Sequence, residues 1–185
     1  TAKAVAANLD HLLVLQPLDT GVNVARLMRE LVVAWESGAR PAIVLTKSDQ
    51  VSINQLEAAR ALATEAAPGV AVVAVSNLTG FGLDELRPLL QPGVTVALLG
   101  ASGAGKSSLV NALAGRRVAL TGNVRESDLR GRHTTVTGQL LALSGGGLLI
   151  DTPGIRGVGL WQAWDGLALA FSDVTGLANG CRFED

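Results

Sequence analysis

The stretch "GASGAGKS", residues 100–107, decides the fold of this chain. It fits the pattern G-x-x-x-x-G-K-[S/T], and it lies between the apolar run 94–99 and a helical pattern over 106–114. Glycines allow successive backbone N–H groups to turn towards one point, and the start of a helix adds positive potential there. The stretch therefore predicts a phosphate-binding loop between a strand and a helix.

Each residue of this loop has an expected role. Lys106 should reach the β- and γ-phosphates, and the Ser107 hydroxyl should be a ligand of Mg²⁺. The remaining members of the predicted nucleotide-binding set surround the phosphates with backbone and hydroxyl groups: Gly100, Ala101, Ser102, Gly103, Ala104, Gly105 and Ser108. A glycine-rich turn that matches the pattern by chance is the alternative, and the strand–loop–helix setting argues against it.

Apolar strand-like runs alternate with helical patterns along the chain. The runs predict strands over 9–15, 42–45, 70–75 and 94–99, a hairpin from 136–143 and 147–150, and helices over 22–35, 53–66, 82–90 and 106–114. This alternation is typical of a three-layer α/β fold with a parallel sheet covered on both faces. Ligands of such sheets bind beyond the carboxyl ends of the strands, where the glycine and polar clusters fall.

A second polar cluster, "TKSD" at residues 46–49, follows the predicted strand 42–45. The Asp49 carboxylate can accept hydrogen bonds from the guanine N1–H and 2-amino groups, which adenine lacks, so a buried Asp49 would reject ATP. The stem of Lys47 can lie along the base. Alone, this short pattern is more typical of a solvated turn. The predicted base-binding set is Thr46, Lys47, Ser48 and Asp49, with Ser76 and Asn77 in a loop that can offer a backbone N–H to guanine O6.

A third cluster, "DTPG" at residues 151–154, follows the predicted strand 147–150. Asp151 can hold Mg²⁺ through water, and the Gly154 N–H can meet the γ-phosphate. An ordinary D-T-P-G turn is the alternative. With the other two clusters present, we expect a nucleotide site.

These clusters resemble the five G motifs of TRAFAC-type GTPases, in the permuted order G4-G5-G1-G2-G3. The resemblance implies a P-loop NTPase fold, that is a Ras-like G domain, with its chain circularly permuted. Four stretches are similar to the ribosome small subunit-dependent GTPase A family (RsgA, also known as YjeQ): "VAANLDHLLVL" (5–15), "GASGAGKSSLVNAL" (100–113), "GRHTT" (131–135) and "DTPGIRGVGLW" (151–161).

The resemblance places switch I in the arginine-rich segment 116–135. It implies that Thr134 or Thr135 closes on Mg²⁺ with its hydroxyl, and we favour Thr135. The arginines of this segment can also meet phosphates of rRNA. A solvated loop is the alternative for its charges.

Three features qualify the resemblance. Thr46 replaces the usual asparagine of N-K-x-D, which predicts a weaker link from the base loop to the phosphate loop. Gly103 stands where many related permuted GTPases have asparagine, so we predict no monovalent-cation site. The end "CRFED" (181–185) resembles the opening of the family's C-terminal zinc module, in which Cys181 would bind Zn²⁺ in the full-length protein. One cysteine cannot complete a tetrahedral site.

The domain organisation follows from this resemblance. We expect a permuted GTPase domain over 1–175, the start of a truncated zinc-binding module over 176–185, and no N-terminal OB domain in this chain. The 185 residues suit one domain with a full core, with 48% hydrophobic residues and a net charge of −1. A single cysteine excludes an internal disulfide, and no apolar run reaches membrane-spanning length. We expect a cytoplasmic monomer without a membrane partner.

The implied function is Mg²⁺-dependent hydrolysis of GTP to GDP and phosphate in late maturation of the small (30S) ribosomal subunit. A guanine-nucleotide switch or assembly checkpoint with slow hydrolysis as a reset is the alternative, and an ATP-dependent enzyme is a third reading. Ile155 stands where Ras-like enzymes place a water-orienting glutamine, so hydrolysis should be slow without the subunit. His133 is the candidate that orients the water, with a role in shaping the loop as its alternative.

Overall fold

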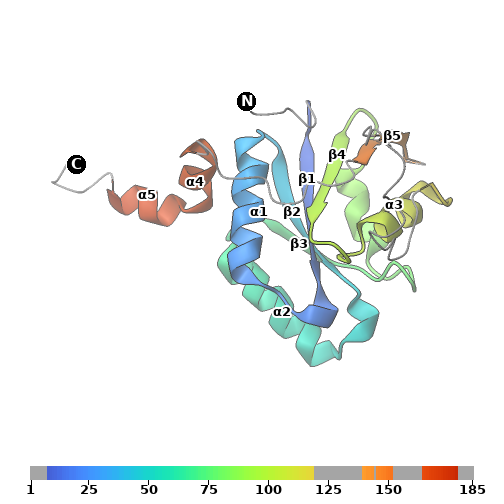
Figure 1. Ribbon diagram of the computed structural model, residues 1–185, viewed down its shortest axis with the longest axis horizontal. Helices are drawn as coiled ribbons and strands as arrows, with labels where there is room; N and C mark the ends of the chain where they lie inside the picture. The colour runs from blue at the N-terminus through green and yellow to red at the C-terminus, as the bar shows by residue number, and fades with distance from the viewer. Residues whose placement is uncertain (1–7, 119–138, 144, 152–163, 179–185) are drawn as a thin grey trace, which may run out of the picture.

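The protein is described by a computed structural model over residues 8–118, 139–143, 145–151 and 164–178. Six strands form one sheet in the order β3-β2-β1-β4-β6-β5 (Figure 1). The strands are β1 (His11–Pro17), β2 (Arg40–Thr46), β3 (Ala71–Ala74), β4 (Thr95–Gly100), β5 (Gln139–Ala142) and β6 (Leu148–Asp151). All neighbouring pairs are parallel except β5 and β6, which are antiparallel. The predicted α/β sheet and its terminal hairpin are confirmed, although residues 136–138 of the hairpin lie outside the described part.

The helices connect and cover these strands. The α-helices are α1 (Val24–Glu36), α2 (Ile53–Ala66), α3 (Lys106–Ala114), α4 (Trp164–Ala170) and α5 (Ser172–Ala178), and the 3₁₀ helices are η1 (Leu18–Thr20), η2 (Ser48–Gln50) and η3 (Leu83–Leu89). None of the helices in the described ranges is long and apolar enough to cross a membrane.

Local sequence signals set the starts of two helices. The Asn23 side chain caps α1 by accepting a hydrogen bond from the Arg26 N–H at 2.9 Å. Ser52 and Gln55 form a capping box at the start of α2, in which each side chain bonds the backbone N–H of the other residue. The segment 82–90 was predicted as a helix and is a 3₁₀ helix, because Pro88 lies inside it and cannot donate a backbone hydrogen bond.

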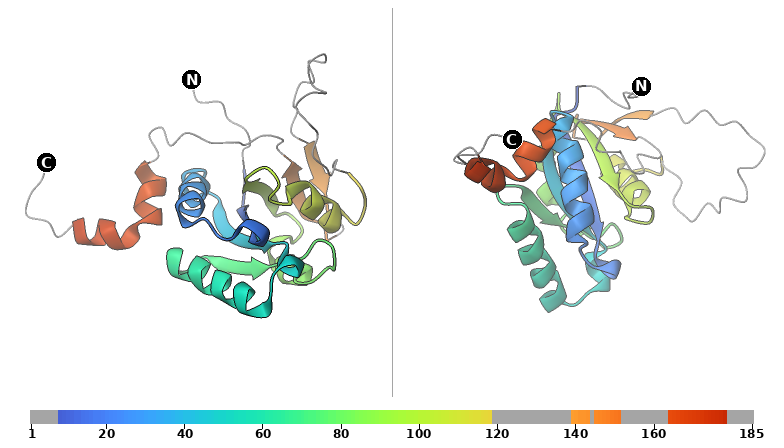
Figure 2. Two further views of the ribbon diagram at one scale, coloured as in Figure 1. Left: turned by 60° about the horizontal axis from the view of Figure 1, so that its bottom comes forward. Right: turned by 60° about the vertical axis from the view of Figure 1, so that its left-hand side comes forward.

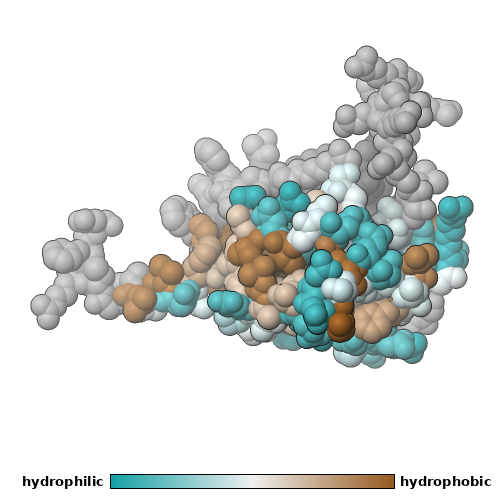
Figure 3. All heavy atoms as spheres, turned by 90° about the horizontal axis from the view of Figure 1, so that it is seen from below, coloured by the Kyte–Doolittle hydropathy of each residue, from teal (hydrophilic) through white to brown (hydrophobic). Residues whose placement is uncertain are grey.

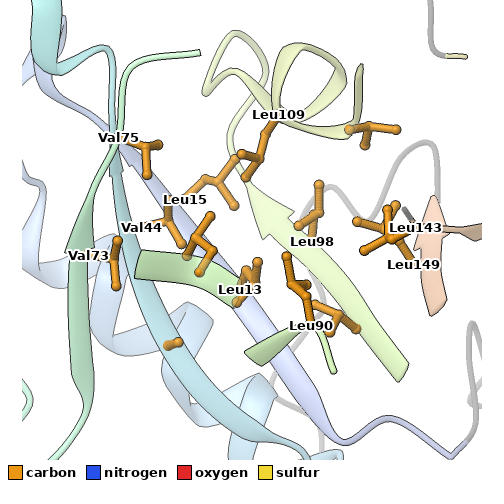
Figure 4. Packing of buried hydrophobic residues seen from close by; sticks show 14 of the residues in the cluster. Leu13, Leu15, Val44, Val73, Val75, Leu90, Leu98, Leu109, Leu143 and Leu149 are labelled. Atoms are coloured by element: carbon orange, nitrogen blue, oxygen red, sulfur yellow. The ribbon is translucent and has the colours of Figure 1, made fainter. Parts of the chain in front are cut away.

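The core lies on both faces of the sheet, because successive side chains of a strand point to opposite faces. Leu13 and Leu15 of β1 pack on the α3 side, in a cluster with Val44, Leu98 and Leu109 (Figure 4). The opposite face carries a second cluster, which joins β1 and β2 to α1 and α2 and includes Val14, Leu27, Leu31, Ile43 and Leu56. This burial on both sides produces the continuous apolar runs of β1, β2 and β4.

Helices α4 and α5 were not predicted, because both are seven residues long and each contains a glycine of low helix propensity. α4 lies beside α1 (Figures 1 and 2), and the Gly166 N–H donates to the Glu36 carboxylate at 2.7 Å. A Cβ at Gly166 would lie 2.4 Å from the Val32 carbonyl oxygen, so only glycine permits this approach. α5 runs across residue 175, where the sequence placed a domain boundary.

Candidate nucleotide-binding site

Two of the polar clusters predicted from the sequence, the phosphate loop and the base loop, lie at one edge of the sheet. In β1, Leu15 pairs with Gly100 at the end of β4, and Pro17 pairs with Thr46 at the end of β2. The phosphate loop and the base loop therefore follow two strands that flank β1. Figure 3 views the molecule from this edge, where hydrophilic and apolar patches alternate.

Glycines give the phosphate loop its shape. Gly100, Gly103 and Gly105 have φ values of 152°, 78° and 89°, which side chains with a Cβ rarely adopt. A Cβ at Gly100 would also lie 2.8 Å from the Leu15 carbonyl oxygen of the neighbouring strand. Gly105 caps α3, so the loop leads directly into the start of a helix as predicted. Such a start is a favourable place for an anion.

The Lys106 ammonium lies across the phosphate loop. Its Nζ donates to the carbonyl oxygens of Gly100 and Ala101, both at 2.7 Å. These contacts hold the positive charge over the first residues of the loop. Ser107 follows in the first turn of α3, where a hydroxyl can face a metal bound to the phosphates.

Two loops carry the predicted base-binding residues, 46–49 after β2 and 76–80 after β3, and we call them the base loops. Asp49 of the first loop is in direct contact with Ser76 of the second. The Ser76 hydroxyl donates to Asp49 Oδ1 at 2.6 Å, and its oxygen accepts from the backbone N–H groups of Leu78 and Thr79. Ser76 is fully buried, so this network fixes the hydroxyl and orients the carboxylate. Asp49 itself is exposed, contrary to the buried carboxylate assumed in the argument against ATP. Discrimination therefore requires that the base cover Asp49 when it binds.

Lys47 has a partner that the sequence analysis missed. Its backbone is left-handed, with φ 60° and ψ 39°, and its Nζ lies 2.6 Å from Asp19 Oδ2 in η1. The position of Asp19 just after β1 was an available signal, since β1 ends at the same edge as β2. The ion pair restricts the side chain whose stem we expect along the base.

Two side chains connect the base loops to the phosphate loop. The Thr46 hydroxyl donates to the Ala104 carbonyl oxygen at 2.8 Å, and Thr46 is fully buried. The Asn77 amide donates from Nδ2 to the Gly105 carbonyl oxygen at 3.3 Å. Thr46 therefore makes the link to the phosphate loop, and the lower strength predicted for that link stays a prediction.

A second polar pair, which the sequence analysis did not predict, joins β1 to α1. Gln16 Nε2 of β1 donates to Glu30 Oε2 of α1 at 2.7 Å, and Gln16 is buried. Burial raises the pKa of the Glu30 carboxyl above its usual value, while the charge of Arg26, the Gln16 hydrogen bond and the charge of Lys106 oppose this shift.

The metal and catalytic predictions are only partly covered by the described residues. Asp151 ends β6, whose Ile150 pairs with Ala97 of β4, so its backbone lies on the strand next to the one that leads into the phosphate loop. This placement and the Ser107 hydroxyl fit the oxygen ligands that Mg²⁺ prefers. Three predicted catalytic or magnesium-binding residues, His133, Thr135 and Gly154, lie outside the described ranges, as does Cys181. Within those ranges, no three His, Cys, Asp or Glu side chains are grouped so that they can hold a metal ion.

The fold and the site define a P-loop protein in which the base-reading loops precede the phosphate loop. Solved structures share this fold. YloQ, described as a circularly permuted GTPase, aligns with a TM-score of 0.70 at 24% identity, over 96% of this chain and 56% of its own, and this likeness shows the fold alone. YjeQ from Thermotoga maritima aligns with a TM-score of 0.66 at 30% identity, over 80% of this chain and 49% of its own.

The sequence comparisons identify the family. The family model described as RsgA GTPase matches residues 1–161, so the chain belongs to the RsgA GTPase family. Proteins named small ribosomal subunit biogenesis GTPase RsgA from Streptomyces avermitilis and Streptomyces coelicolor are each 50% identical over 182 residues, which is 98% of this chain. RsgA 1 of Listeria monocytogenes is 46% identical over 188 residues. The chain spans about half the length of these relatives, 49% to 52%.

Proposed function

We propose that this chain is the GTP-binding and GTP-hydrolysing part of a protein that acts in maturation of the small ribosomal subunit. The names of its relatives support both the substrate and the pathway. The observation that carries the proposal is the hydrogen bond from Ser76 to Asp49, because it presents a carboxylate to a base at the edge where the phosphate loop lies.

The residues divide the recognition of GTP between them. Asp49 accepts from the guanine N1–H and 2-amino groups, and the stem of Lys47, held by Asp19, covers one side of the base. The phosphate loop surrounds the phosphates with N–H groups, and the Lys106 ammonium exchanges its loop carbonyls for phosphate oxygens. Mg²⁺, when bound through Ser107, Thr135 and Asp151, would neutralise the charge that develops on the phosphates.

The catalytic water has no obvious partner at the position after the "DTPG" stretch. Ile155 cannot form a hydrogen bond to water, so hydrolysis by the protein alone should be slow. We propose that His133, beside the magnesium-binding Thr135, orients the water when the small subunit docks and that Gly154 meets the γ-phosphate. A group supplied on docking can raise the rate on the order of 10³-fold or more.

The proposal also includes the RNA partner, the cellular location and the domain limits. The arginine-rich segment 116–135 would contact rRNA phosphates, and the protein would act as a cytoplasmic monomer. The GTPase domain would span 1–175, and Cys181 in the segment 176–185 would join further ligands of Zn²⁺ in the full-length protein.

The test is GTP turnover by the full-length protein with and without purified small subunits. Slow turnover that the subunits accelerate supports the proposal, and the variant His133→Ala should lose the acceleration while GTP binding stays intact. Tight binding of GTP without acceleration favours a checkpoint that acts by binding alone. Equal competition by ATP would refute guanine specificity.

A further inference from the structure

We propose that Asn77 is a positioning residue that, together with Thr46, helps to hold two successive peptide groups of the phosphate loop in the direction that binds phosphate. The inference rests on the nucleotide site proposed above and adds to it. Our sequence prediction gave Asn77 a different role, in which its backbone N–H meets guanine O6. The present proposal concerns its side-chain amide and a partner in the phosphate loop.

The geometry that supports this role is a pair of neighbouring hydrogen bonds. Thr46 donates to the carbonyl oxygen of Ala104, and Asn77 donates to that of Gly105, at 2.8 and 3.3 Å. A Cβ at Gly105 would lie 3.4 Å from Asn77 Nδ2 and 3.7 Å from Thr46 Oγ1, so both side chains reach the same place in the loop. Within the described part of the chain, Asn77 Oδ1 is buried without a hydrogen-bond partner. The polar contact of this amide is therefore made through Nδ2.

The planar peptide bond explains what these two contacts do. In a trans peptide group, the C=O and the following N–H point in opposite directions. The Thr46 hydroxyl, which holds the Ala104 carbonyl outward, turns the Gly105 N–H the other way. The Gly105 carbonyl accepts the Leu109 N–H at 2.8 Å as the first hydrogen bond of α3, and Asn77 is a second donor to it that supports the same direction for the Lys106 N–H. Thr46 and Asn77 both lie on the base side of the loop, so these two N–H groups are turned away from the base loops. A β-phosphate bound in the cradle would receive them.

Asn77 contacts the phosphate loop with an amide, whereas Thr46 contacts it with a hydroxyl. A threonine side chain ends one bond sooner than an asparagine, and it reaches Ala104 alone among the loop carbonyls. The amide of Asn77 reaches the next carbonyl from the other base loop. Because Asn77 follows Ser76, which orients Asp49, the same short segment contacts both the base reader and the phosphate loop.

The experiment measures the affinity for GDP by calorimetry and the melting temperature without nucleotide, in the full chain. Asn77→Ala removes one donor and should weaken GDP binding about five- to tenfold, with little change in the nucleotide-free melting temperature. Asn77→Asp keeps the shape and sets an acceptor against the Gly105 carbonyl, so it should weaken binding further. Leu62→Ala is the control, because Leu62 lies in α2, outside the loops of the site, and is 42% exposed; it should bind GDP as the wild type does.

The second arm is a double-mutant cycle with Thr46→Asn. An asparagine at position 46 reaches further into the loop, so Thr46→Asn combined with Asn77→Ala should bind GDP within about twofold of Thr46→Asn alone. Wild-type affinity in Asn77→Ala, or an Asn77→Asp variant that binds as well as Asn77→Ala, would overturn the proposal. An equal loss from Asn77→Ala in both backgrounds would also overturn it. If the wild-type chain does not bind GDP, the proposed nucleotide site fails instead.

Discussion

The substitution Asp49→Asn tests base recognition most directly. The amide oxygen of the variant side chain can still accept the Ser76 hydroxyl, so the contact between the two base loops survives. The amide nitrogen presents a donor to guanine where the carboxylate presented an acceptor. Hydrogen bonds to charged groups contribute about 1.5–3 kcal/mol each, so the loss of one of the two lowers GTP affinity by at least about 10- to 10²-fold. Xanthine nucleotide, with a 2-oxo group, should gain relative affinity.

The assay is competition between GTP and XTP for the wild-type and variant chains. Asp84→Asn is the matched control, because its carboxylate is 84% exposed and pairs with Arg87 in η3, away from the base loops. The control should bind GTP as the wild type does. Unchanged GTP affinity in Asp49→Asn would show that Asp49 does not read the base.

Three further predictions test the phosphate loop, the packing of α4 and the buried carboxyl. Lys106→Ala should abolish GTP turnover in the folded protein; normal turnover would place the phosphate site elsewhere. Gly166→Ala should lower the free energy of unfolding by about 1–3 kcal/mol, because its Cβ would lie 2.4 Å from the Val32 carbonyl, whereas Gly176→Ala, which has open space, should not; equal urea midpoints would refute this contact. Glu30 has a raised pKa in the folded chain, so its ionisation costs stability as pH rises above 4.5. Glu30→Gln should therefore reduce the fall in melting temperature as the pH rises from 4.5 through the raised pKa of Glu30, and an unchanged profile would refute it.

The sequence predicted those parts of the fold that local patterns determine. The apolar runs predicted β1, β2 and β4 to within two residues at each end, and the helical patterns predicted α2 and α3 with their observed limits. The glycine pattern of residues 100–107 predicted the loop, because positive φ values there require glycine. These features are encoded by neighbouring residues, and no distant contact is needed to see them.

The contacts that assemble the site depend on positions far apart in the chain. Asp19 contacts Lys47 across 28 positions, and only its place after β1 indicated this pair. Gln16 contacts Glu30 between β1 and α1, and no local pattern indicates that pair. The closeness of Thr46 to the phosphate loop was expected from the family, yet its replacement of asparagine led to the prediction of a weaker link. The structure shows that a hydroxyl already spans the distance to Ala104, since the buried β2 end brings Thr46 close to the loop.

The reversed order of the motifs has a structural consequence at the end of the chain. β1 lies between β2 and β4, so base and phosphate loops meet at one edge whichever half comes first. In this order the chain that leaves β6 continues to α4, and α4 packs on α1 through Gly166 and Glu36. α1 itself follows β1 and carries Glu30, whose raised pKa is partly opposed by the positive charge of Lys106. Helix α4, which follows the phosphate loop in the chain, thus packs on α1, which precedes the base loop. The hydrogen bond from Gly166 to Glu36 therefore joins the last helices of the chain to its first half.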